Sequence, residues 1–380
     1  MRKDVVIIGG GVIGCSVAYY LAKMGINNVA VIEKSYISSG ATGRCGGGIR
    51  QQWTSPENVK LAMASVKLFE QFKDELNMDI EFYQGGYLLL AYTDEEVDRF
   101  KEQIRMQTSL GLDVTLLTPK EALDIVPYLN LDDLKAAAYC PTDGHANPFL
   151  VNFAYAQNAE KMGVKILKNT VVENILVEDG KIKKVITSNG EIETSIVVNA
   201  AGGWAAEIGK MVGIDLPVIP YRHQILVTEP VEHFLDPLVM SFSKNIYFRQ
   251  TEHGSLVMGE SNYEEVPGYN HKASWKFLES ISKKITFFIP RLKDLSIVRQ
   301  WSGLYATTPD ALPIIDEFDS VTRFIFVGGY SGHGFMLAPI SGKLVAEMIK
   351  FGAPRSLNID QLKFDRFSDS STLKGEKNVV

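Results

Sequence analysis

A glycine-rich turn, Gly9-x-Gly11-x-x-Gly14, lies between a short β-branched run and a helix-like stretch near the start of the chain. A second apolar run, NVAVIEK, follows and contains Glu33 about 20 residues beyond the glycines. Strand, glycine turn, helix and strand form a βαβ unit, which requires a parallel sheet. The pattern therefore predicts an α/β fold that begins with a dinucleotide-binding unit.

Each part of this unit has a physical role in holding a dinucleotide. Gly9 makes the turn, Gly11 lets a pyrophosphate approach the backbone, and Gly14 lets the helix pack closely on the strand. The helix N-terminus offers free N–H groups and a positive partial charge to the phosphates. Glu33 can accept hydrogen bonds from ribose hydroxyls and would repel a 2′-phosphate.

The βαβ unit alone does not separate NAD from FAD. The small-residue run SSGATGRCGGGIR, residues 38–50, follows directly and can lie along an extended pyrophosphate and a flat ring system. A second GxGxxG with a following acid is missing from the sequence, so a separate NAD(P)H domain is not indicated. These features favour FAD.

Composition excludes several other classes of function. The net charge of −6, without blocks of like charge, disfavours nucleic acids, including tRNA, and anionic membranes as main partners. Cys15, Cys45 and Cys140 form no CxxC pair, so we expect no metal site and a reducing compartment. Glycines interrupt the apolar start, which argues against a signal peptide, and no run approaches the roughly 18 apolar residues of a membrane span.

Local signals predict further elements along the chain. Ser55-Pro56 should begin a helix that runs to about Leu76, and Thr118-x-x-Glu121 has the spacing of a capping box. Within residues 171–203 the apolar pattern has a period of two, and its Asp-Gly and Asn-Gly pairs predict an antiparallel meander. The apolar run FIFVGG and a final helix come near the end, and the last polar residues should be frayed.

Six segments together resemble the FAD-dependent amine oxidoreductases of the D-amino-acid-oxidase superfamily. They are VVIIGGGVIGCSVAYYLAKMG, VIEK, SGATGRCGGGIRQQW, VVNAAGGW, GLYATTPDALPIID and GGYSGHGFMLAP, and they span residues 4–350. Within that superfamily the chain is most similar to the β subunits of sarcosine oxidase and of dye-linked L-proline dehydrogenase. RCGGGIRQQW, PTDGHANPF and SGHGFMLAP carry this closer match.

The resemblance implies a glutathione-reductase-like FAD lobe with a parallel sheet, and a substrate lobe whose mixed or antiparallel sheet covers the flavin. We expect the FAD-binding domain to be discontinuous, with residues 1–80, 141–216 and 302–365. The substrate domain should comprise 81–140 and 217–301, and 368–380 should be a flexible tail. The implied reaction is hydride removal from the carbon next to an amine, with L-proline as the first candidate substrate. Sarcosine or glycine oxidase and hydroxyproline dehydrogenase are the alternatives, and an electron-relay subunit is the alternative of another class.

The family pattern also implies the residues that hold FAD non-covalently. They are Gly9, Gly11, Val12, Ile13, Gly14, Glu33, Lys34, Ala41, Thr42, Arg44, Cys45, Gly47, Gly48, Val172, Ala200, Ala201, Gly202, Trp204, Gly303, Gly329, Ser331, Gly332, His333, Gly334, Phe335 and Met336. Gly303 stands where monomeric sarcosine oxidases attach the flavin to a cysteine. The glycines before the last helix should let its positive N-terminus approach the ring edge that becomes negative on reduction.

Catalytic candidates follow from what the reaction needs, which is a carboxylate anchor and a dry pocket over the flavin. Arg50 is the anchor candidate, because a guanidinium matches a carboxylate as a two-point fork. Tyr247 matches a substrate-facing tyrosine of the family, and His223 is a further candidate for the pocket lining. Tyr305 stands where glycine-oxidase-like relatives have an arginine.

Two positions in GGYSGHGFMLAP complete the candidate set. His333 is expected beside the flavin rather than as a proton-transfer catalyst. Met336 replaces a lysine that helps sarcosine oxidases hold the substrate carboxylate, so the pocket should be more apolar and suit a proline ring. The other histidines considered, His233, His253 and His271, are expected at the surface.

The resemblance also bears on the electron acceptor. Val257 stands where monomeric sarcosine oxidases have a lysine that promotes reaction with oxygen, which favours a dehydrogenase. The histidine that attaches a second flavin in heterotetrameric sarcosine oxidase falls near Pro148. An FMN would therefore be non-covalent and shared with a partner subunit that carries electrons onward. We expect a cytoplasmic protein, with peripheral membrane association only through partners.

Overall fold

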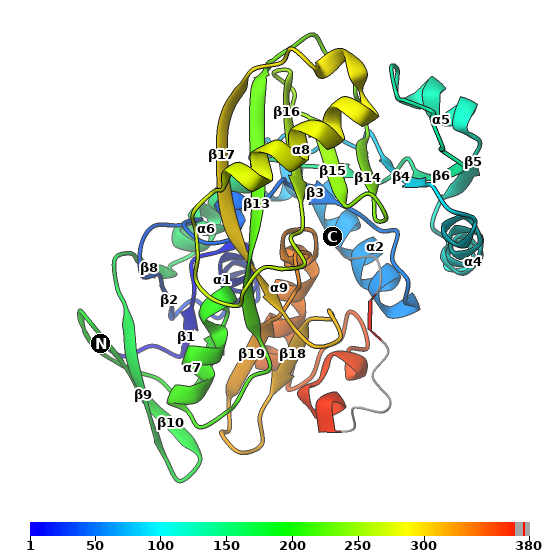
Figure 1. Ribbon diagram of the computed structural model, residues 1–380. Helices are drawn as coiled ribbons and strands as arrows, with labels where there is room; N and C mark the ends of the chain where they lie inside the picture. The colour runs from blue at the N-terminus through cyan, green and yellow to red at the C-terminus, as the bar shows by residue number, and fades with distance from the viewer. Residues whose placement is uncertain (369–374, 377–380) are drawn as a thin grey trace.

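Two large sheets dominate the computed structural model, which describes residues 1–368, 375 and 376 (Figure 1). The first sheet runs in the order β18 (Ile314–Glu317), β19 (Phe324–Gly328), β12 (Val197–Asn199), β1 (Val5–Ile8), β2 (Val29–Ile32) and β8 (Lys165–Leu167). Its neighbouring strands are parallel except for β18, which is antiparallel to β19. The predicted parallel sheet is therefore confirmed.

Both faces of this sheet are covered, which explains why its central strands are apolar throughout. Val5 and Ile7 of β1 face a core built with α1 (Val12–Lys23), α2 (Pro56–Glu70), α6 (Pro148–Lys161) and α9 (Gly334–Phe351). Val6 and Ile8 point to the other face. That face packs against β9 (Val172–Glu178), β10 (Lys181–Thr187), β11 (Gly190–Glu193) and α7 (Ala205–Met211).

The second sheet is mixed, as expected for the substrate lobe. It runs in the order β17 (Ile297–Thr307), β13 (Ile219–Pro230), β16 (Ser255–Glu260), β15 (Ile246–Gln250), β14 (Leu238–Ser241), β4 (Tyr87–Ala91), β6 (Ala136–Cys140) and β5 (Thr115–Leu117). One face packs under α8 (Trp275–Phe288). The other face presents side chains such as Tyr247, Ile225 and Val257.

The long antiparallel pair β13 and β17 connects the two sheets. Its register extends from Ile219 opposite Thr307 to Thr228 opposite Ile297. Figure 1 shows both strands running from the second sheet, beside α8, to the first sheet, beside α7. At that end Ala306 of β17 packs against the core on one face of the first sheet. The proposed domain boundary at 301/302 lies within β17, and the boundaries remain predictions.

Several local predictions are confirmed. Thr118 and Glu121 form the reciprocal capping box of α5 (Pro119–Ile125). The meander forms through the β9–β10 and β10–β11 pairings. The helix expected from Ser55 to about Leu76 is instead two helices, α2 and α3 (Phe72–Leu76), which meet at Gln71.

Two helices were not predicted from the sequence, the short α7 and the longer α4 (Asp94–Ser109). Thr93 and Glu96 form a capping box at its start, so the signal was present. A short sheet pairs β3 (Gly48–Ile49) with β7 (Gly144–His145). No helix in the part of the chain that the structure describes is long and apolar enough to cross a membrane. Most of the expected tail, 368–380, lies outside the described residues.

Candidate active site

The turn between β1 and α1 can only be made by glycines. Gly9 has φ +117°, and a Cβ added there would lie 2.4 Å from the carbonyl oxygen of Ala200. A Cβ on Gly14 would lie 2.0 Å from the carbonyl oxygen of Gly9. The close approach of helix and strand leaves the N-terminus of α1 facing the space beyond the turn, as dinucleotide binding requires.

Glu33, after β2, holds this turn together. Its carboxylate accepts hydrogen bonds from the Gly10 N–H (2.8 Å) and the Ser35 N–H (2.9 Å). The Ser39 hydroxyl donates a third bond over 3.1 Å. An ionised carboxylate offers about four acceptor sites, so it can hold the turn and still accept from a ribose hydroxyl.

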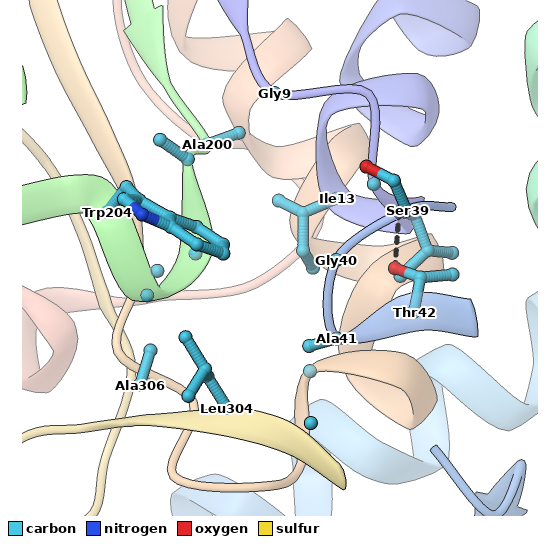
Figure 2. A pocket seen from close by; sticks show the side chains of 18 of the residues that line it. Gly9, Ile13, Ser39, Gly40, Ala41, Thr42, Ala200, Trp204, Leu304 and Ala306 are labelled. Carbon is cyan, nitrogen blue, oxygen red and sulfur yellow. Dashed lines mark hydrogen bonds between the residues drawn. The ribbon is translucent and has the colours of Figure 1, made fainter. Parts of the chain in front are cut away.

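A cavity of about 630 Å³ extends from this turn to the second sheet. Figure 2 shows Trp204 and Ala200 on one side of it and the segment Ser39 to Thr42 on the other. It brings together these residues from the expected FAD set: Gly9, Gly11, Val12, Ile13, Glu33, Lys34, Ala41, Thr42, Arg44, Cys45, Val172, Ala200, Ala201, Gly202, Trp204, Gly303, Gly329, Ser331, Gly332, Gly334 and Phe335. A glycine cradle, a helix N-terminus and a ribose-binding acid on one continuous cavity fit FAD.

Three glycines of the expected set lie outside the cavity lining and act through the backbone. Gly14 packs α1 on the turn. Gly47 has φ +73°, and a Cβ there would lie 2.3 Å from the carbonyl oxygen of Ala146. A Cβ on Gly48 would overlap the Tyr87 hydroxyl at 1.9 Å. Gly47 and Gly48 therefore let the run after Cys45 pack tightly behind the cavity.

Aromatic side chains from the second sheet form the far end of the cavity. His223 of β13 stacks on Tyr305 of β17 with ring centroids 4.2 Å apart and an interplanar angle of 6°. The His223 Nε2 lies 3.0 Å from the Tyr247 hydroxyl on β15. All three line the cavity. Burial lowers the pKa of His223 to about 3, so its imidazole is neutral at physiological pH.

Arg50 lies outside the cavity lining, within a compact cluster beside its aromatic end. Its guanidinium lies 3.9 Å from the Trp53 ring centroid and 5.6 Å from that of Phe242. The Trp53 indole donates to the Arg50 carbonyl oxygen (3.0 Å) and its ring contacts His333 edge-on. Burial lowers the pKa of Arg50, and the nearby phenol of Tyr305 acts in the opposite direction.

His333 and Met336, both at the start of α9, are also outside the cavity lining. His333 occupies the N-cap position of α9 without a side-chain capping bond, and its ring contacts Trp53. Burial, reinforced by the Arg50 charge, lowers its pKa well below its usual range. Met336 is 9% exposed and belongs to the core beneath the parallel sheet, where its carbonyl oxygen accepts from Ser65. The structure therefore does not bring the Met336 side chain to the cavity, in contrast to the expectation.

A buried carboxylate, Asp143, orients the backbone that follows Arg50. It accepts from the Gln51 N–H (2.8 Å), from the Gln51 amide (3.1 Å) and from the Gln52 amide (3.1 Å). Burial raises its pKa to about 6, and these hydrogen bonds limit the rise. Asp143 lies in PTDGHANPF, one of the segments that carry the family resemblance. Nothing in that sequence indicated that Asp143 supports the segment after Arg50.

His271 was expected at the surface, but the structure shows it partly buried. Its side chain lines the cavity and stacks near Trp204 with ring centroids 6.0 Å apart. Tyr269 also stacks on Trp204, at 5.4 Å and 10°, and the Lys34 ammonium lies 3.0 Å from the centre of the Trp204 ring. The polar, turn-rich sequence around His271 predicted exposure because nothing local shows that the loop folds back over the cavity.

Comparison with known proteins agrees with this geometry. The family described as FAD dependent oxidoreductase (DAO) matches residues 4–348. This chain belongs to the FAD-dependent oxidoreductase family. Membership implies FAD as its cofactor, and the cavity residues described above would hold it.

Three relatives show how far the similarity extends. The crystal structure of L-proline dehydrogenase from P. horikoshii is 41% identical, with a TM-score of 0.93, and the match covers 97% of this chain and 98% of that one. The sarcosine oxidase subunit beta of Arthrobacter sp. is 33% identical over 93% of this chain and 89% of its own. Rat mitochondrial dimethylglycine dehydrogenase is 30% identical over 93% of this chain, which spans only 43% of its length.

Proposed function

We propose that this chain is an FAD-dependent dehydrogenase that oxidises a secondary amino acid, with L-proline as its first candidate substrate. The observation that carries the proposal is the near-complete match to L-proline dehydrogenase from P. horikoshii, at 41% identity and a TM-score of 0.93. FAD would accept the hydride from the carbon next to the substrate amine. The protein's own residues bind the substrate, orient it and exclude water.

Arg50 is the proposed anchor for the substrate carboxylate. Its buried guanidinium can offer two parallel N–H donors, and a partly desolvated site strengthens such a pair. Tyr305 connects the anchor to the cavity, because it lines the cavity and lies close enough for the Arg50 charge to act on the pKa of its phenol. A substrate held at Arg50 would therefore lie against the aromatic end.

His223, Tyr247 and Tyr305 would form the wall that faces the substrate ring. Their stacked, hydrogen-bonded arrangement presents flat apolar surface with few rotatable bonds, which suits a ring better than a flexible amine. A neutral amine can release hydride without a general base. The pKa of about 3 for His223 means that this imidazole adds no positive charge that would oppose the developing iminium.

The proposed acceptor is a carrier other than oxygen, reached through a partner subunit. Val257 contributes an aliphatic side chain beside Tyr247 on the cavity-facing side of the second sheet. The relative from Arthrobacter sp. is named as a subunit, which supports assembly with partners. A non-covalent FMN shared with such a partner, near Pro148, is part of this proposal, as is a cytoplasmic location with membrane contact only through partners.

Anaerobic reduction of the flavin tests the substrate assignment. The purified, flavin-loaded chain is mixed with L-proline, hydroxyproline, sarcosine, glycine and D-alanine, and bleaching of the flavin absorbance is followed. We expect L-proline to bleach it fastest. The 33% identity to a sarcosine oxidase subunit makes sarcosine the main competitor. Stoichiometric peroxide in air would overturn the dehydrogenase assignment, and no bleaching by any substrate would favour an electron-relay subunit.

Substitution of Arg50 tests the anchor. Arg50→Gln should raise KM for proline by about a hundredfold, because a charge-assisted two-point contact is worth about 2–3 kcal/mol. Flavin content should be unchanged, since Arg50 is outside the cavity lining. An unchanged KM would remove Arg50 from the proposed site.

A further inference from the structure

We propose that Glu376 is a specificity-determining residue that opposes the binding of carboxylates at Arg50 and so sets how tightly anionic ligands are held there. The proposal rests on the proposed role of Arg50 as the carboxylate anchor. It concerns a residue far from the anchor in sequence and outside every motif of the family resemblance.

Glu376 is buried at the start of α2, with only 6% of its surface exposed. Its carboxylate accepts from the Thr54 hydroxyl (2.6 Å), from the Thr54 N–H (3.2 Å) and from the Asn58 amide (3.0 Å). These donors hold both carboxylate oxygens. The negative charge also lies near the positive end of a helix, which favours it.

The chain that carries Glu376 is also fixed from the other side. The Glu376 N–H donates to the carbonyl oxygen of Asp310 over 2.9 Å. The buried carboxylate of Asp310 forms a paired contact with Arg366, through Nε (2.7 Å) and Nη2 (3.1 Å). Asp310 therefore anchors the C-terminal part of the chain at two residues, so Glu376 occupies a defined position.

Hydrogen bonds from Thr54 hold this carboxylate against the segment that begins with Arg50. Thr54, which donates twice to Glu376, directly follows Trp53, and the Arg50 guanidinium lies 3.9 Å from the centre of the Trp53 ring. Burial lowers the pKa of Arg50. Tyr87, Glu376 and Asp143 act to raise it, in decreasing order of effect. Both side chains are buried, and the contacts through Thr54 and Trp53 place the two charges in one buried cluster.

This closeness has a direct consequence for a ligand. A carboxylate that approaches Arg50 is attracted by the guanidinium and repelled by Glu376, and the low local dielectric strengthens both effects. Both the attraction and the repulsion are much weaker for a neutral ligand of the same shape. Glu376 should therefore weaken the binding of carboxylates selectively and leave neutral analogues unaffected.

Glu376→Gln is a mild test of this idea. The glutamine oxygen can still accept from Thr54, and its amide can donate to Asn58 after a flip of the Asn58 side chain. The Asn58 Oδ1 has no hydrogen-bond partner among the described residues, so the flip provides it with a donor. Glu279→Gln, at an exposed site on α8, makes the same change in net charge and is the matched control.

The experiment measures binding by isothermal titration to the flavin-loaded chain. The ligands are pyrrole-2-carboxylate, which has no saturated carbon next to its nitrogen, and the neutral pyrrole-2-carboxamide. Glu376→Gln should bind the carboxylate about tenfold more tightly, a change typical of removing a nearby like charge from a buried site. Binding of the carboxamide should change less than twofold. Glu376→Ala should change carboxylate binding in the same direction, and Glu279→Gln should change neither ligand.

Arg50→Gln separates this proposal from the proposed function. If Arg50→Gln leaves carboxylate binding unchanged, the anchor assignment fails and the Glu376 proposal fails with it. If Arg50→Gln weakens carboxylate binding while Glu376→Gln behaves like Glu279→Gln, only the Glu376 proposal is overturned. Weaker carboxylate binding in Glu376→Gln would also overturn it, because that result would mean that Glu376 supports the site rather than opposing the ligand.

Discussion

The two ends of the cavity are built in different ways. The dinucleotide end consists mainly of backbone and small side chains, in segments such as residues 9–14 and 38–45 that follow one another closely in sequence. The aromatic end consists of large side chains, His223, Tyr247 and Tyr305, from separate strands of the second sheet. A backbone site depends on steric limits at particular residues, whereas a side-chain site depends on the register of distant strands.

The largest expected effect tests the backbone end. Gly14→Ala places a methyl group 2.0 Å from the Gly9 carbonyl oxygen, so α1 and β1 must move apart. We expect almost complete loss of flavin and of folded protein, measured by the flavin-to-protein absorbance ratio and by circular dichroism. At Gly40 an added Cβ would contact no protein atom, so Gly40→Ala should fold normally. Equal behaviour of the two variants would refute the steric argument.

The second prediction concerns the support of the aromatic end and depends on pH. A carboxyl whose pKa rises from 3.8 to about 6 on folding costs up to about 3 kcal/mol of stability once it is ionised. Between about pH 4 and pH 6 the folded state keeps the Asp143 proton, whereas the unfolded state has lost it. The free energy of unfolding should therefore fall as pH rises through this range. Asp143→Asn removes this titration.

The difference in melting temperature between Asp143→Asn and the wild-type chain isolates this effect. The loss of acceptor strength toward Gln51 and Gln52 gives an offset that does not depend on pH. On top of that offset, the variant should gain several degrees relative to wild type between pH 4 and pH 7. A difference that stays constant across this range would show that Asp143 does not titrate there.

The third prediction tests whether the aromatic end affects catalysis without affecting flavin binding at the dinucleotide end. Tyr247→Phe removes the contact with His223 but keeps the ring. We expect kcat/KM to fall about tenfold, or about 1.4 kcal/mol, with flavin content unchanged. Tyr263→Phe, at a side chain that is 78% exposed, is the matched control. Loss of flavin from Tyr247→Phe would show that the two ends are not separable.

The smallest expected effect concerns side chains at the dinucleotide end. Trp204→Leu removes the ring beneath the Lys34 ammonium and the stacking partner of Tyr269. FAD should bind about fivefold more weakly, because such contacts are worth about 1 kcal/mol. Flavin fluorescence reports its release. Trp275→Leu makes the same change at a side chain that is 81% exposed, and it should leave the affinity unchanged.

The glycines, caps and turns could be predicted from sequence because each reflects a local steric or hydrogen-bonding requirement. Gly9 and Gly14 tolerate no Cβ, and Thr118 with Glu121 completes a cap within one helical turn. The apolar pattern of β1 likewise follows from burial on both faces. These features depend on a few consecutive residues, so the amino-acid sequence by itself determined the parallel sheet and the cradle.

The family resemblance suggested His223, Tyr247 and Tyr305 as pocket residues, but only the tertiary structure decided that they lie together at the aromatic end. It also placed His271 on the cavity lining, Met336 in the core beneath the parallel sheet, and Glu376 against Thr54 in the segment that follows Arg50. Sequence periodicity shows that a side chain is buried but not which distant segment it meets. That choice follows from strand register and from how segments distant in sequence fold back on one another, which are set by packing across the whole molecule.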